Sequence, residues 1–156
     1  MTQVLLWEDI YAGYRYFDTF HKNVLFPFGY GLSYTKFDIS EMRIEKVGDG
    51  IKGSVMVENT GKFAGKEVIQ VYLSKGSGSD LGRPVQELKG FEKTPLLEPG
   101  QKKRLCITIP WRELAVYEER KAAWVIGIAS VQKYIARRCY IGKEHCGHGM
   151  EIRQRL

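Results

Sequence analysis

The chain has 156 residues, a hydrophobic content of 44% and a formal net charge of +6. This length suits one domain of ordinary size, and the balance of apolar and charged residues is typical of a soluble globular protein. The sequence has no run of about 18 apolar residues, so it predicts no membrane-spanning helix.

The cysteines and the first residues bear on the cellular compartment. Three cysteines, Cys106, Cys139 and Cys146, are too few to indicate a disulfide framework, and this favours a reducing compartment. The apolar patch near the start has no basic segment before it and is interrupted by Glu8 and Asp9, so it does not predict a secretory signal peptide. These features favour the cytoplasm.

The first 36 residues are rich in aromatic side chains. Within FPFGYGLSYTKF, which spans 26–37, Pro27, Gly29 and Gly31 prevent a regular helix. Aromatic side chains of this size are normally buried, so they are expected to have a packing partner. The aromatic residues of this stretch and of the preceding YRYFDTF are Tyr14, Tyr16, Phe17, Phe20, Phe26, Phe28, Tyr30, Tyr34 and Phe37.

Residues 37 to about 127 contain strand-length segments separated by turn residues, at a spacing typical of a β-sandwich. Apolar residues alternate with polar ones in several of these segments. One segment, KEVIQVYLS, is apolar on both faces for part of its length and is predicted to lie centrally in its sheet. Another, PVQELKGFEKT, is predicted to be a short strand or a bulged edge. The predicted strands are 37–47, 51–58, 66–74, 84–94, 104–109 and 122–126.

These elements predict an all-β fold, namely an antiparallel β-sandwich of the immunoglobulin or fibronectin type III kind. A small β-barrel is the alternative. Trp111 and Trp124 are predicted to be the large core residues. Cys106, in the middle of a strand, is predicted to be a small core residue.

Four blocks of the sequence carry a resemblance to a known family. They are EDIYAGYRYFDTF, LFPFGYGLSYTKF, VENTGKFAGKEVIQVYLS and RPVQELKGFEKTPLLEPGQ. In order and spacing they resemble the C-terminal part of glycoside hydrolase family 3 enzymes, a family that includes beta-glucosidases and beta-xylosidases. The resemblance covers about residues 8–126.

The resemblance implies a division of the chain. Enzymes of this family have a barrel domain, an α/β sandwich domain and a fibronectin type III-like domain. GYRYFD resembles the last strand of the α/β domain, and FPFGYGLSY resembles the connector that follows it. Residues 1–35 are therefore expected to be the end of the α/β domain with its connector. Residues 36–130 are expected to be the fibronectin type III-like sandwich, and 131–156 an atypical basic tail.

The resemblance also implies what this chain lacks. The family's catalytic Asp and Glu belong to the two upstream domains, so no catalytic residue and no cofactor is assigned, and the chain alone is predicted to be inactive as a glycosidase. Asp18, in GYRYFD, is expected to make a structural hydrogen bond.

The aromatic residues are expected to pack against the upstream domains of the parent enzyme, because aromatic clusters often mark protein interfaces. With those domains missing, some of the rings are expected to be exposed or to fold back on the sandwich. Homodimerisation and contact with an oligosaccharide at the rim stay open as further roles. The residues assigned to interdomain packing are Tyr14, Tyr16, Phe17, Phe26, Phe28, Tyr30 and Tyr34.

Three other functions would also use features of this sequence. A free-standing carbohydrate-binding or protein-interaction module is the main alternative, with Tyr30 and Tyr34 as sugar-stacking candidates. The basic tail suggests nucleic-acid binding as a further function. A basic stretch confined to one end is more typical of a solvated terminus, so no nucleic-acid partner is predicted. Cys139, His145, Cys146 and His148 do not have the spacing of a standard zinc site, so no metal is predicted.

Overall fold

The computed structural model describes residues 9–74 and 82–126. The fold within these ranges is all-β, as predicted, and its sheets are antiparallel. None of the described helices is long and apolar enough to cross a membrane. In chain order the elements are α1 (Tyr14–Thr19), β1 (Phe37–Val47), β2 (Gly50–Asn59), β3 (Val68–Ser74), β4 (Gln86–Lys93), β5 (Lys102–Pro110), α2 (Trp111–Leu114), β6 (Val116–Glu118), a 3₁₀ turn (Glu119–Lys121) and β7 (Ala123–Val125).

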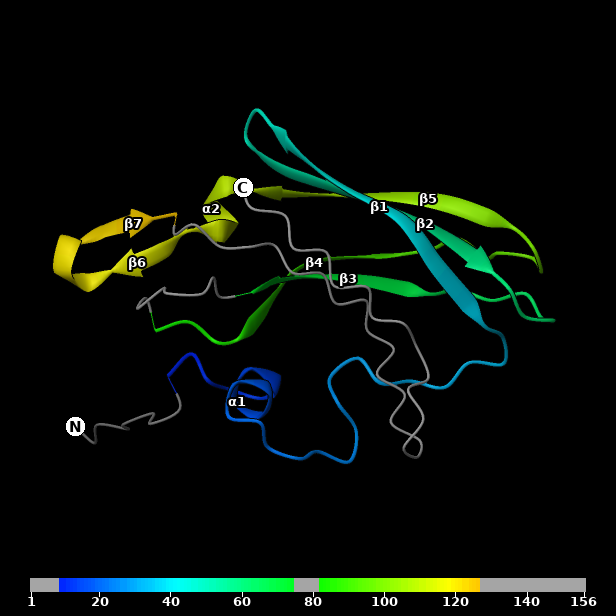
Figure 1. Cartoon of the computed structure of the whole chain (residues 1–156), viewed down its shortest axis with the longest axis horizontal. Helices are drawn as coiled ribbons and strands as arrows, with labels where there is room; N and C mark the ends of the chain where they lie inside the picture. The colour runs from blue at the N-terminus through cyan, green and yellow to red at the C-terminus, as the bar shows by residue number, and fades with distance from the viewer. Residues whose placement is uncertain (1–8, 75–81, 127–156) are drawn as a thin grey trace, which may run out of the picture.

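The strands form two facing sheets and a short hairpin. One sheet has the order β1-β2-β5, the second pairs β3 with β4, and β6 pairs with β7. Figure 1 shows the three-stranded sheet on one side of the β3–β4 pair and α1 on the other side. The β3–β4 pair is therefore a middle layer, covered on both faces.

The core lies between the two sheets and follows from period-two alternation in the strands. Ile51, Val55 and Val57 of β2 are at most 5% exposed, and they face the buried Ile69 and Leu73 of β3. Each fully buried aliphatic side chain of this kind stabilises the fold by roughly 1.5–3 kcal/mol. The same alternation in β5 buries Leu105 and Ile109.

Strand β1 changes face part of the way along. The register shifts between Ser40 and Arg43, and Glu41 has a φ of 47°, which is rare for a residue with a side chain. Before this bulge Ile39 packs on the core, and after it Ile44 does so. Ile39 and Ile44 are separated by an odd number of positions, which would place them on opposite faces of a regular strand. The bulge therefore lets both residues pack on the core.

The two-sided apolar character of β3 has a different origin from the one predicted. Among the described residues β3 pairs with β4 and with no other strand. Its inner face carries Ile69 and Leu73, while Tyr72, 3% exposed, makes an edge contact with the ring of Tyr14 in α1. Cover by the α1 layer, and not a second neighbouring strand, accounts for the burial of both faces.

Two predicted core residues are exposed. Cys106 is exposed because it alternates with Leu105 and Ile107, which point inward, so the prediction for this thiol was wrong. Trp124 is 70% exposed and stands opposite Tyr117 in the β6–β7 hairpin, so that prediction was also wrong. Trp111, by contrast, is half-buried and packs against the core.

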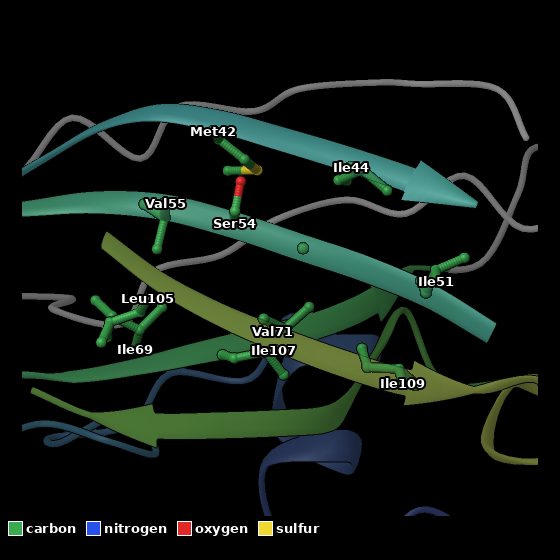
Figure 2. A pocket seen from close by; sticks show the side chains of 11 residues that line it. Met42, Ile44, Ile51, Ser54, Val55, Ile69, Val71, Leu105, Ile107 and Ile109 are labelled. Atoms are coloured by element: carbon green, nitrogen blue, oxygen red, sulfur yellow. The ribbon is translucent and has the colours of Figure 1, made fainter. Parts of the chain in front are cut away.

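A small cavity interrupts the core beside Gly53 of β2. It measures about 30 Å³, roughly the volume of one water molecule, and apolar side chains form most of its wall (Figure 2). Gly53 has no side chain to fill it, and a Cβ built there would meet nothing closer than the carbonyl oxygen of Ile107 at 3.8 Å. The cavity is a packing defect of the core and too small for a ligand.

Asn59, at the end of β2, is fully buried and joins three segments of the chain. Its amide nitrogen donates to the carbonyl oxygens of Phe63 and Leu97, both at 2.8 Å. Its side-chain oxygen accepts from the hydroxyl of Thr35 at 2.6 Å and from the N–H of Gly61 at 3.1 Å. The described residues thus satisfy this buried amide completely.

Candidate functional site

Helix α1 occupies the stretch that resembles a strand, so the prediction of a strand for GYRYFD was wrong. The helix has six residues and begins after Gly13, whose φ of 57° and ψ of −132° suit glycine and almost no other residue. No side chain caps its first turn. An isolated helix of this length is unstable in water, so contacts with the sandwich must hold it in place.

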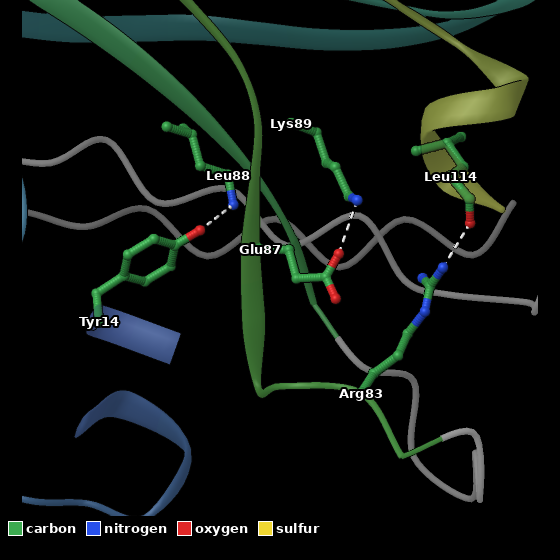
Figure 3. Close-up of polar contacts among 6 residues, drawn as sticks. All are labelled: Tyr14, Arg83, Glu87, Leu88, Lys89 and Leu114. Carbon is green, nitrogen blue, oxygen red and sulfur yellow. Dashed lines mark hydrogen bonds and ion pairs between the residues drawn. The ribbon is translucent and has the colours of Figure 1, made fainter. Parts of the chain in front are cut away.

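Polar side chains of α1 bind the outer edge of β4. The phenolic oxygen of Tyr14 accepts the N–H of Leu88 at 2.7 Å (Figure 3), and the hydroxyl of Thr19 accepts the N–H of Val85 at 3.0 Å. The carboxylate of Asp18 accepts from the side-chain amide of Gln86, which agrees with the structural role expected for Asp18. A strand edge with unpaired N–H groups can pair with another chain and cause aggregation. Here α1 covers part of the edge of β4.

The chain after α1 is tied to the sandwich again at its far end. The carbonyl oxygen of Lys36 accepts the N–H groups of Thr60 and Gly61, at 2.9 and 3.2 Å. The hydroxyl of Thr35 reaches the buried Asn59. Residues 14–36 are therefore a strap across the sandwich, bonded to it at both ends.

Aromatic contacts organise the strap into local clusters. The ring of Tyr14 stacks on Phe28, with centroids 4.8 Å apart, and Phe26 lies 4.9 Å from Tyr30. Tyr16 contacts Phe20 at 5.0 Å. In spite of these contacts, the rings of Tyr16, Phe20, Phe26 and Phe28 are each at least 41% exposed.

The strap exposes a large amount of apolar surface. Exposed fractions reach 67% for Phe26, 90% for Leu25 and 97% for Tyr34. Apolar groups gathered at this density on a surface mark an interaction site. We refer to the following residues as the aromatic surface: Tyr16, Phe17, Phe20, Leu25, Phe26, Phe28, Leu32 and Tyr34.

The aromatic surface overlaps in part with the residues that the sequence assigns to interdomain packing. Five of the residues assigned to interdomain packing are exposed members of the aromatic surface, as expected for rings without a partner, while Tyr14 and Tyr30 are half-buried. The assignment left out Phe20, Leu25 and Leu32. Two leucines inside a segment that contains glycine and proline are a usable signal of exposure.

A buried cation lies next to the strap. Arg83 is 5% exposed, and its Nη2 donates to the carbonyl oxygen of Leu114, the last residue of α2, at 2.7 Å (Figure 3). Burial lowers the pKa of Arg83, and the carboxylate of Glu87 partly opposes that effect. Glu87 itself forms an ion pair with Lys89 at 2.7 Å.

The described residues offer exposed apolar surfaces for binding. No group of three or more His, Cys, Asp or Glu side chains in the ranges 9–74 and 82–126 is placed to hold a metal ion. Cys139, His145, Cys146 and His148 lie outside the described residues, as does the basic tail.

Known proteins with similar sequences identify the family of the chain. The family described as "Fibronectin type III-like domain" matches residues 67–137. A beta-glucosidase of Kluyveromyces marxianus is 47% identical over 124 residues, which are 78% of this chain and 14% of that protein. A beta-glucosidase of Ruminococcus albus is 50% identical over 113 residues, which are 72% of this chain and 12% of that protein.

Solved structures give the same match. Beta-glucosidase 3B from Thermotoga neapolitana in complex with glucose aligns at 42% identity with a TM-score of 0.76, covering 85% of this chain and 18% of that one. The GH3 beta-glucosidase of Bifidobacterium adolescentis aligns at 33% identity, also with a TM-score of 0.76, covering 84% and 20%. The chain thus spans between 12% and 20% of the length of these relatives. It belongs to glycoside hydrolase family 3, related to its beta-glucosidases, and contains the fibronectin type III-like domain of that family.

Proposed function

We propose that this chain is the structural accessory part of a larger family 3 glycoside hydrolase, and that the aromatic surface docks against the catalytic domains of that protein. The observation that carries the proposal is the exposure of this surface on a strap bonded at both ends to a well-packed sandwich. A surface held rigidly before docking loses little conformational entropy on binding. The parent protein would hydrolyse beta-glucosides, as the names of the relatives indicate.

The proposal also moves the boundary between the upstream domain and the sandwich. The sequence predicts this boundary between residues 35 and 36, and we place it at Gly13. The hydrogen bonds of Tyr14 and Thr19 to the β4 edge support α1 moving with the sandwich as one body. Gly13, with its glycine-specific backbone conformation, is then the joint to the upstream domain. In this arrangement α1 presents Tyr16, Phe17 and Phe20 to the docked domain.

An activity assay tests the accessory role. The purified chain is expected to release no nitrophenol from nitrophenyl beta-glucoside above a blank, because no catalytic pair of carboxyl groups is assigned to it. Turnover that survives purification through a second column would overturn the proposal.

The carbohydrate-binding alternative is favoured by one observation, the 97% exposure of Tyr34. Calorimetry with cello- and xylo-oligosaccharides separates it from the structural role. Binding heat that is lost in Tyr34→Ala would support a carbohydrate-binding module, and the absence of heat with every oligosaccharide would support the structural role alone.

A further inference from the structure

A polar hollow lies on the outer face of the three-stranded sheet, away from the core. It has a volume of about 290 Å³. Its position follows from period-two alternation, because β2 directs Val55 and Val57 inward and the residues that alternate with them outward. All three strands contribute to its wall, with Arg43 and Glu45 from β1, Lys52 and Ser54 from β2, and Arg104 and Cys106 from β5.

Three cationic side chains of this wall surround Ser54. Arg43 stands directly opposite Ser54 in the register of β1 and β2, and Lys52 is two positions before Ser54 on the same strand. Arg104 is the diagonal neighbour of Ser54 on β5. Neighbours of these kinds have Cβ atoms about 4.5–8 Å apart, so long side chains from all three positions reach the same small volume.

The positive charge of the hollow is only partly neutralised. Arg104 forms an ion pair with Glu41, and Glu45 stands opposite Lys52 in the register. Within the part of the chain that the structure describes, neither Arg43 nor Lys52 forms an ion pair. One positive charge therefore stays in excess. Like charges this close repel each other, and an anion bound between them would relieve the repulsion.

A ligand can reach this hollow from solvent. Arg43, Lys52 and Cys106 are exposed, and Ser54 and Arg104 are half-buried. The three-stranded sheet and α1 lie on opposite sides of the β3–β4 pair (Figure 1), so a domain docked on α1 would leave the hollow open.

We propose that the hollow binds a tetrahedral oxyanion, either free phosphate or the phosphate group of a small phosphorylated ligand. Such a group carries close to two negative charges near neutral pH and has several strong acceptor oxygens, which suits donors that converge from three strands. The hollow lies just below the range of about 300–1,000 Å³ that is typical of pockets for drug-sized molecules, so it suits a small ligand. This inference goes beyond the proposed function and does not depend on it.

The test uses inorganic phosphate as the probe and heteronuclear NMR of the whole chain at constant ionic strength. We expect the amide signals of Ser54 and Cys106 to shift in a saturable way with a Kd on the order of 1–10 mM, because water and salt screen exposed charges. Lys52→Gln should weaken binding about three- to fivefold. Lys46→Gln, the same change at an exposed lysine outside the hollow, should leave the affinity unchanged. Glu45→Gln removes the carboxylate from the wall and should strengthen binding by a factor similar to the loss in Lys52→Gln.

Four results would overturn the proposal. They are no saturable shift at the two amides, equal losses in Lys52→Gln and Lys46→Gln, weaker binding in Glu45→Gln, and tighter binding of acetate than of phosphate. A glucose monophosphate, titrated in the same way, distinguishes the two sources of the anion. Tighter binding of this ester than of inorganic phosphate would support a phosphorylated ligand, and equal affinity would support the free ion. Unmodified glucose that binds as tightly as its phosphate would contradict an anion site.

Discussion

The phenolic oxygen of Tyr14 lies 2.7 Å from the backbone nitrogen of Leu88 and accepts its N–H, 74 positions along the chain. The same tyrosine stacks on Phe28 and touches the edge of Tyr72. One side chain therefore joins the strap, the edge of β4 and the outer face of β3. Attachment of the strap to the sandwich depends on contacts of this kind and not on the intrinsic stability of α1.

Substitution of Tyr14 by Phe tests the polar part of this attachment. Tyr14→Phe keeps the ring but leaves the partly buried N–H of Leu88 without its acceptor, so we expect a loss of about 1–2 kcal/mol in the free energy of unfolding. Urea unfolding measures it. Tyr11→Phe, which removes an exposed hydrogen bond to Gly82, is the matched control and should lose less than about 0.5 kcal/mol. Equal losses in the two variants would contradict this role for Tyr14.

Two glycines of β2 should respond oppositely to substitution by alanine. A Cβ at Gly50 would clash with the carbonyl oxygen of Ile109, so Gly50→Ala must displace backbone and should destabilise strongly. A Cβ at Gly53 enters the cavity of Figure 2, so Gly53→Ala should stabilise by about 0.5–1 kcal/mol, since glycine is unfavourable inside a strand. Thermal unfolding of both variants checks the pair, and a destabilised Gly53→Ala would show that the cavity is already filled.

Asn59 and Thr35 should be energetically coupled. Asn59→Ala removes the four hydrogen bonds of the buried side chain and should cost about 2–4 kcal/mol, while Thr35→Val should cost about 1–2 kcal/mol. Because the two side chains share one hydrogen bond, the double variant should lose less than the sum of the single losses, by about 0.5–1.5 kcal/mol. Strict additivity in a double-mutant cycle would show that the bond between them contributes nothing.

The sequence predicts the sandwich well because alternation in β2 and β5 is strict and one face is buried. It also predicts the bulged character of β4, whose register shifts opposite Val71 and Tyr72. The failures have physical causes. The sequence of α1 has no helical pattern of its own. The helix is held by hydrogen bonds to residues that lie 66 and 74 positions further along the chain. Cys106 was assigned by its place in the strand, although alternation with Leu105 already pointed it outward.

The aromatic surface could be found from sequence as a density of rings, but its geometry could not. Which rings fold back is decided by the stack of Tyr14 on Phe28 and by the contact with Tyr72, both of which depend on the tertiary fold. Trp124 shows the opposite case. Its size suggested the core, yet it belongs to a three-residue strand paired in a hairpin, where the larger part of its surface stays exposed.

The exposed rings should matter little for the stability of the isolated chain. Phe26→Ser and Tyr34→Ser remove side chains that are 67% and 97% exposed, so each should change the free energy of unfolding by less than about 0.5 kcal/mol. Tyr72→Ala, at a buried ring, should cost about 3–5 kcal/mol in the same urea assay. A large loss in Tyr34→Ser would mean that this ring serves the sandwich and not a partner.

Binding to a related enzyme tests whether the aromatic surface docks against the catalytic domains. The Kluyveromyces marxianus beta-glucosidase, expressed without the stretch that matches this chain, serves as the partner, and calorimetry measures its affinity for the chain. We expect saturable binding, and an affinity at least tenfold lower in the combined Phe26→Ser and Tyr34→Ser variant. A tenfold change corresponds to about 1.4 kcal/mol of binding free energy, and anchor residues at interfaces typically contribute more than that. Lys103→Ser, an exposed change on β5, should leave the affinity unchanged. Equal affinity for the unmodified chain and the aromatic variant would contradict the account.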